Sequence, residues 1–129
     1  MNFKKLVGLT VSALALSLII LGDANAAGVS VKCEVRSGRS KASVDGTGVS
    51  GLFYAKLKSG LNVAKSKNLR ADPITREVEF DFDSNPNDIR AGATAIAPNF
   101  IKNATVVGTI YKASDNSVVG SARGFCRVK

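Results

Sequence analysis

Apolar and polar residues alternate along most of the chain after residue 26, and this period-two pattern is typical of β-strands with one buried face. In VSVKCEVR, residues 29–36, the valines and Cys33 share one face and the polar side chains share the other. The alternation returns in residues 51–60, 75–83 and 118–129. These segments predict an all-β fold of about seven short antiparallel strands, arranged as a β-sandwich of immunoglobulin-like architecture.

The two cysteines, Cys33 and Cys126, stand near opposite ends of this patterned region, each on the apolar face of its segment. In an oxidising compartment, a cysteine pair without metal-ligand companions predicts one disulfide, here between the N- and C-terminal strands. Closing so long a loop stabilises a fold by roughly 4 to 5 kcal/mol in the chain-entropy model. A redox-active pair is disfavoured, because such cysteines usually lie close together, as in C-x-x-C.

The N-terminus has the layout of a secretory signal peptide. Lys4 and Lys5 precede an apolar run over residues 6–21, and the small-residue triplet at 24–26 follows it. We therefore expect residues 1–26 to be cleaved and residues 27–129 to form one domain in the periplasm or outside the cell. An uncleaved membrane anchor is the alternative, since about 20 apolar residues span a bilayer.

Acidic residues dominate EVEFDFDSNPND, residues 77–88. On an extended strand Glu77, Glu79, Asp81 and Asp83 project to one side at intervals of about 6.6 to 7 Å, which is too wide for successive carboxylates to hold one calcium ion. Val78, Phe80 and Phe82 would then point into the core. The stretch is interpreted as the solvated face of a strand, and we expect neighbouring strands to bring lysines such as Lys56 and Lys58 opposite these acids.

The turn after this strand offers a weak calcium site. Its oxygen ligands would come from Asp81, Asp83, Asn85 and Asp88. The EF-hand pattern fails, because Pro86 takes the place of the sharp-turn glycine and Gly92 the place of the bidentate glutamate. Instead, Asn85 as N-cap, Pro86 at the first position and Gly92 beyond the last predict a single helical turn.

Catalytic signals are scarce. The chain has no histidine, which removes the commonest general base and the most frequent transition-metal ligand. A glycosidase using two acids of the 77–83 strand is a weak alternative, because any alternating acidic strand gives a suitable spacing. GTGVSG, residues 46–51, matches a dinucleotide-binding pattern in letters only, since a strand-like segment follows it where a helix is needed. We expect no enzyme activity and no cofactor.

The formal net charge of +8 is the last signal. Basic surfaces attract nucleic acid, anionic polysaccharide or lipid headgroups, and two clusters are candidates for polyanion binding: Arg36, Arg39 and Lys41, and Lys65, Lys67 and Arg70. Tyr54 shares a strand face with Lys56 and Lys58. The sequence favours an exported, non-catalytic sandwich with a structural or binding role, whose partner is an envelope or extracellular protein or an anionic polymer. A polyanion-binding module is the alternative.

Overall fold

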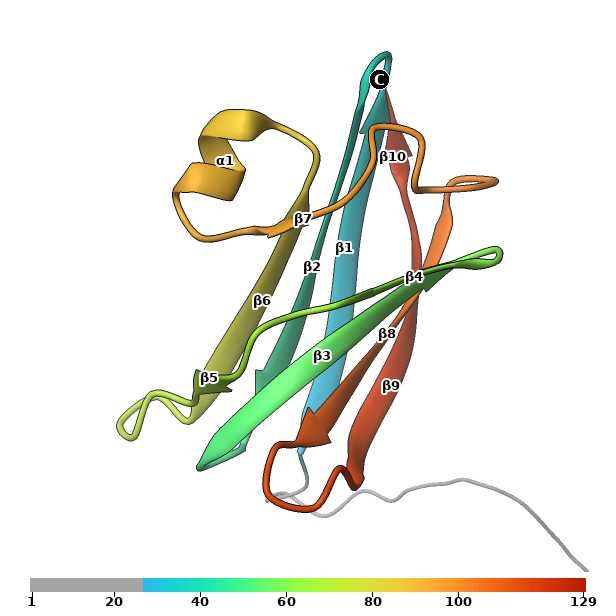
Figure 1. The fold of residues 1–129 in the computed structure, drawn as a ribbon. Coiled ribbons are helices and arrows are strands. Elements are labelled where there is room, and N and C mark those ends of the chain that lie inside the picture. Colours follow the sequence, from blue (N-terminus) through green and yellow to red (C-terminus); the bar gives the residue numbers. More distant parts are fainter. Residues whose placement is uncertain (1–26) are drawn as a thin grey trace, which may run out of the picture.

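A computed structural model describes residues 27–129 as two facing β-sheets, so the predicted signal peptide lies outside the described residues. Sheet A has the order β10-β1-β2-β6-β7, with strands Arg127–Val128, Gly28–Arg36, Arg39–Thr47, Glu77–Asp83 and Thr94–Ala95. Sheet B has the order β4-β3-β8-β9, with strands Asn62–Lys65, Leu52–Ser59, Thr105–Lys112 and Val118–Phe125, and β5, Leu69–Arg70, pairs with β3. Figure 1 shows β3 and β8 crossing in front of β1 and β2.

The prediction of a mostly β, two-sheet fold is confirmed. Seven of the described strands have four or more residues, and the other three, β5, β7 and β10, have two each. The expectation of purely antiparallel pairing was wrong in detail, because β10 pairs with β1 and β7 with β6 in parallel. In each parallel pair the two strands are separated by a much longer stretch of chain than a hairpin turn, as parallel neighbours require.

The predicted disulfide is confirmed. Cys33 in β1 is bonded to Cys126, which lies between β9 and β10, and their Cα atoms are 4.5 Å apart. The chain therefore leaves sheet B at the end of β9, passes the disulfide and joins sheet A as β10. This bond ties the first strand of sheet A to the last long strand of sheet B.

The core lies between the sheets and is built from the inward positions of the alternating strands. Val78, Phe80 and Phe82 are buried there, as the pattern of β6 predicts, together with Val44, Leu57 and Ile110. Small residues let the sheets approach closely: a Cβ added at Gly108 in β8 would lie 2.7 Å from Val44 and 2.8 Å from Val31. The two outer faces of the sandwich are thus separated by a closely packed layer of apolar side chains.

The predicted helical turn is α1, Pro86–Arg90, and Figure 1 shows it beside the end of β6. The Asn85 side chain accepts a hydrogen bond from the Asn87 backbone N–H at 2.8 Å, which satisfies a free donor of the first turn. Gly92 follows the helix with φ of +119°, a backbone angle that favours glycine. The helix covers one end of the outer face of sheet A.

One pairing expectation was wrong. The basic strands β3 and β4 are not beside the acidic strand β6, because β6 pairs with β2 and β7 in sheet A while β3 and β4 lie in sheet B. The segment between β4 and β6 crosses from one sheet to the other, so neighbours in sequence are not neighbours in a sheet. The acids and the lysines of these strands consequently face opposite sides of the sandwich.

Within residues 27–129, no helix is long and apolar enough to cross a membrane.

Candidate functional site

The outer face of sheet A carries the acidic stretch. Cross-strand register places Glu79 beside Asp45, Asp81 beside Ser43, and Asp83 beside Lys41. Glu77, Glu79 and Asp81 are exposed, as predicted for a solvated strand face. Asp83 departs from that prediction: it is 4% exposed.

The burial of Asp83 has a specific partner. Arg39 donates two hydrogen bonds to its carboxylate, from Nε at 3.0 Å and from an Nη at 2.7 Å, and donates a third to Asp88 at 2.9 Å. Burial raises the pKa of Asp83, but the bonds from Arg39 and from the Asn85 N–H outweigh it and hold the pKa below its usual value. Arg39 thereby joins β2, β6 and α1.

These contacts engage most of the weak calcium candidates. Asp83 and Asp88 both accept from Arg39, and Asn85 caps α1, so a cation would have to displace a guanidinium and a helix cap. Asp81, the fourth candidate, is exposed on the strand face beside Glu79. The described part of the chain contains no group of three or more His, Cys, Asp or Glu arranged to hold a metal ion.

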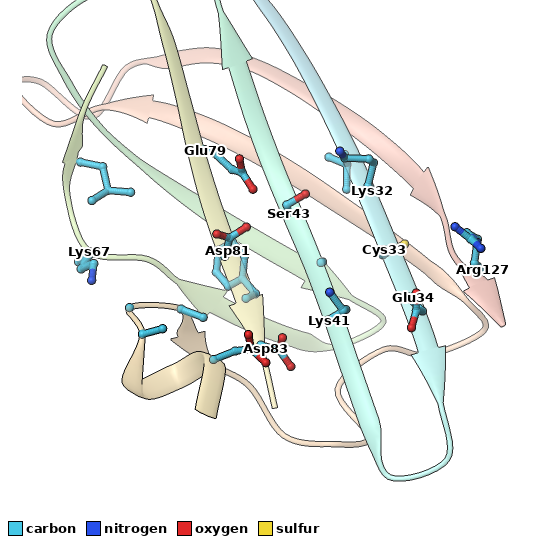
Figure 2. Close-up of a pocket in the computed structure, with 18 of the residues that line it drawn as sticks. Lys32, Cys33, Glu34, Lys41, Ser43, Lys67, Glu79, Asp81, Asp83 and Arg127 are labelled. Atoms are coloured by element: carbon cyan, nitrogen blue, oxygen red, sulfur yellow. The ribbon is translucent and has the colours of Figure 1, made fainter. Parts of the chain in front are cut away.

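A shallow depression of about 790 Å³ lies over sheet A. Figure 2 shows its lining side chains projecting from β6, β2 and β1, with Arg127 at one border and Lys67 at the other. Both signs of charge occur throughout it, in Lys32, Glu34, Lys41, Glu79, Asp81 and Asp83. The depression thus has no single-sign field with which to attract a charged ligand.

Two acids in this region, Glu79 and Asp45, have raised pKa values. A hydrogen bond shared with Asp81, together with the charge of that carboxylate, raises the pKa of Glu79. Desolvation raises the pKa of Asp45. The two acids of an inverting glycosidase are about 6.5 to 9.5 Å apart, which is farther than two carboxyl groups joined by a hydrogen bond. The raised pKa of Glu79 is therefore explained by its neighbour Asp81 on the same strand face and does not indicate a catalytic pair of this kind.

The first predicted basic cluster is compensated by acids. Arg36 binds the Glu34 carboxylate, Arg39 binds Asp83 and Asp88, and Lys41 is cross-strand from Glu34 on one side and from Asp83 on the other. The second cluster is divided by the fold. Lys65 in β4 and Arg70 in β5 belong to sheet B, whereas Lys67 borders the depression over sheet A.

The outer face of sheet B has a different composition. Alternation and register place five cations on it: Lys56 and Lys58 in β3, Lys65 in β4, Arg70 in β5 and Arg123 in β9. None of the five strands of this sheet contains Asp or Glu. We call these five side chains the basic face.

Like charges lie directly opposite each other on the basic face. Lys56 is cross-strand from Lys65, an arrangement that destabilises a sheet when no anion is present. Both ammonium groups lie over tyrosine rings: Lys65 Nζ is 4.5 Å from the centre of the Tyr54 ring, and Lys56 Nζ is 5.4 Å from that of Tyr111. The two rings stack on each other with centres 5.0 Å apart. The tyrosines act as a platform that holds the lysines in place.

Sequence reasoning found Lys65 and Arg70 but did not include Arg123, Lys56 or Lys58 in a binding cluster. Arg123 reaches the basic face only through the register of β8 with β9, where it lies opposite Val107, which in turn lies opposite Lys58. The sequence did contain an indication of this face: residues 46–71 and 116–129 include no Asp or Glu. Where the fold brings such stretches together, their lysines and arginines have no acidic neighbour to neutralise them.

The comparisons with known proteins return no match: no family model, no curated protein and no solved structure corresponds to this chain. The geometry of the two outer faces is thus the basis for the function proposed below.

Proposed function

We propose that this chain is an exported, non-catalytic binding protein whose basic face on sheet B binds an anionic partner. The observation that carries the proposal is the arrangement of five cations on strands that contain no carboxylate. A surface of one sign attracts a polyanion over several ångströms and speeds its capture. Sheet A, where acids compensate the cations, lacks this property.

The position of the tyrosines supports recognition of charge over stacking on bases. Tyr54 is 6% exposed, lies under Lys65 and donates a hydrogen bond from its hydroxyl to Asn116 at 2.9 Å. Single-strand nucleic-acid binders need exposed aromatic faces on which bases stack. The partner we propose therefore presents phosphate, sulfate or carboxylate groups to the lysines.

The proposal also covers where the protein is located and which sandwich architecture it has. The Cys33–Cys126 disulfide supports an oxidising compartment, in agreement with the signal peptide predicted over residues 1–26. An immunoglobulin-like arrangement is supported by the order of the long strands, because β1-β2-β6 facing β4-β3-β8-β9 corresponds to A-B-E facing C′-C-F-G.

The test is binding of the oxidised protein to a sulfated polysaccharide at increasing salt. We expect affinity to fall steeply with salt. The double variant Lys56→Gln/Lys65→Gln should lose about 30-fold in affinity at low salt, because each lysine near an anionic surface contributes about 1 kcal/mol. Removing these lysines leaves the core untouched, so the fold should be retained.

The matched control is Lys32→Gln/Arg127→Gln, which removes the same charge from sheet A. We expect it to bind nearly as well as the parent. Equal losses in the two variants would show that total charge decides binding, and salt-independent or absent binding would rule out the basic face as a polyanion site.

A further inference from the structure

We infer that the anionic partner is a lipid surface, which the protein meets with the end of sheet B formed by the β3–β4 hairpin. This inference rests on the proposed function and adds a second contribution to binding, the insertion of apolar side chains. The apolar side chains at this end of sheet B are Leu61 at the hairpin tip, Val63 in β4 and Phe125 at the end of β9. The nearby cations are Lys58, Lys102 and Arg123. We call this group the hairpin end.

The apolar side chains of the hairpin end are unusually exposed. Leu61 is 99% exposed, Phe125 80% and Val63 58%. Val63 lies opposite Lys58 in β3, and Phe125 lies opposite Thr105 in β8, so Val63 and Phe125 are on the two opposite edge strands of sheet B. Three large apolar side chains thus stay in water at the same end of this sheet, and exposed apolar side chains gathered on one surface mark interaction sites.

The exposure of Leu61 comes with a well-anchored hairpin. Ser59 Oγ accepts a hydrogen bond from the Lys102 N–H at 2.7 Å and donates one to the Thr105 carbonyl at 2.7 Å. Asn62 Nδ2 donates to the Phe100 carbonyl at 2.7 Å. Figure 1 shows the hairpin and the loop before β8 at the same end of the molecule. These bonds hold the tip in one position, so its leucine is presented outward at little cost in ordering.

Cations lie next to these apolar side chains. Lys58 and Arg123 flank Val107 in one cross-strand row, and the Lys102 side chain packs beside Gly60 at the tip. Basic side chains with apolar ones among them are the combination by which peripheral proteins bind anionic bilayers, since the charges meet headgroups and the apolar groups enter the interface. A water-soluble polyanion would use the cations alone and gain nothing from Leu61.

The experiment compares binding of the oxidised protein to two probes. One is vesicles of phosphatidylcholine mixed with anionic phosphatidylglycerol, which gives them a negative surface potential, and the other is soluble polyphosphate. We expect Leu61→Ser and Phe125→Ser each to lower the vesicle partition coefficient about tenfold. Their binding to polyphosphate should stay unchanged. The matched control is Ile74→Ser, because Ile74 is 89% exposed but lies in the turn between β5 and β6, which Figure 1 shows far from the tip of the β3–β4 hairpin.

The outcomes separate this inference from the proposed function. If Leu61→Ser and Phe125→Ser bind vesicles as the parent does while Lys56→Gln/Lys65→Gln loses both probes, the lipid inference fails and the basic face stands. If the parent binds polyphosphate but not the anionic vesicles, the lipid inference also fails, and the basic face stands as a site for a soluble polyanion. If the parent binds neither probe, both proposals fail.

Discussion

Lys41 on sheet A and Lys56 on sheet B have equivalent places, each on an outer face with a paired strand on both sides. Lys41 faces Glu34 and Asp83, whereas Lys56 faces Lys65 and Thr109. The first lysine is compensated within the fold and the second is not. The comparison teaches that the net charge of a chain does not locate a binding surface, and that the pairing of strands decides which cations remain available to a partner.

The largest expected effect comes from cutting the covalent link between the two sheets. Replacing both cysteines, Cys33→Ala/Cys126→Ala, should lower the free energy of unfolding by about 2 to 5 kcal/mol, because the bond closes a loop of 93 positions. Urea unfolding of the oxidised parent and the variant measures the loss. Reductant should destabilise the parent and leave the variant unchanged; a loss below about 1 kcal/mol would contradict a structural role for the bond.

The second prediction concerns sheet A, where acids neutralise the cations. Asp83→Asn should cost about 2 to 3 kcal/mol at pH 7, because it breaks a largely buried pair and leaves the Arg39 guanidinium without its main partner. Chemical unfolding measures the loss. Asp81→Asn is the matched control, since Asp81 is exposed two positions away, and it should change stability by less than about 0.5 kcal/mol.

The same pair predicts a pH dependence. Since the pKa of Asp83 in the fold is held below its usual value, its ionisation stabilises the protein above the unfolded pKa of about 3.9. That contribution should be lost as the pH falls from about 5 through the folded pKa. Asp83→Asn should flatten this part of the stability profile, and an unchanged profile would mean that Asp83 is not ionised in the fold.

The third prediction tests the close packing that keeps the two outer faces apart. Gly108→Ala should destabilise by about 1 to 3 kcal/mol, because its Cβ would meet Val44 and Val31 within 3 Å. Thr109→Ser, an outward substitution at the next position that keeps the hydroxyl bonded to Ser121, should change stability by less than about 0.5 kcal/mol. Thermal unfolding of both variants measures the difference, and a neutral Gly108→Ala would show that the sheets are looser than described.

The smallest expected effect is the change in stability when one lysine is replaced by glutamate, and its sign should differ between the outer faces of the two sheets. Lys56→Glu places a carboxylate opposite Lys65 and should stabilise the fold by about 0.2 to 1 kcal/mol at low salt. Loss of the weak contact between Lys56 and the Tyr111 ring reduces this gain. Lys41→Glu places like charges beside Glu34 and Asp83 and should destabilise by a similar amount. Added salt should shrink both effects. The same sign in both variants would remove the distinction between the faces.

The sequence predicted the local structure well. Alternation located the long strands, the apolar face of β6 and the inward cysteines, and the Asn85–Pro86 pair located α1. These features depend on side chains within a few positions of one another, so they can be read without knowing the pairing. The role of Gly46 was not predicted from the sequence: it lies inside β2, where Ile110 and Val78 leave no room for a side chain.

The site was harder to predict because it depends on register between distant strands. Arg39 looked like part of a free basic cluster, but Asp83, which is 44 positions away, neutralises it. Lys58 and Arg123 come together only because β8 lies between β3 and β9. Periodicity states which face a residue takes within its strand, and it carries no information on which sheet the strand joins.

The most direct test of the central claim is to map the binding surface residue by residue. Amide chemical shifts of the oxidised protein, followed by NMR during titration with inorganic tripolyphosphate, would report which strands the anion touches. The account predicts saturable shifts in β3, β4, β8 and β9, centred on Lys56 and Lys65, that diminish with salt. Shifts of equal or greater size around Arg36, Lys41 and Arg127 on sheet A would contradict it.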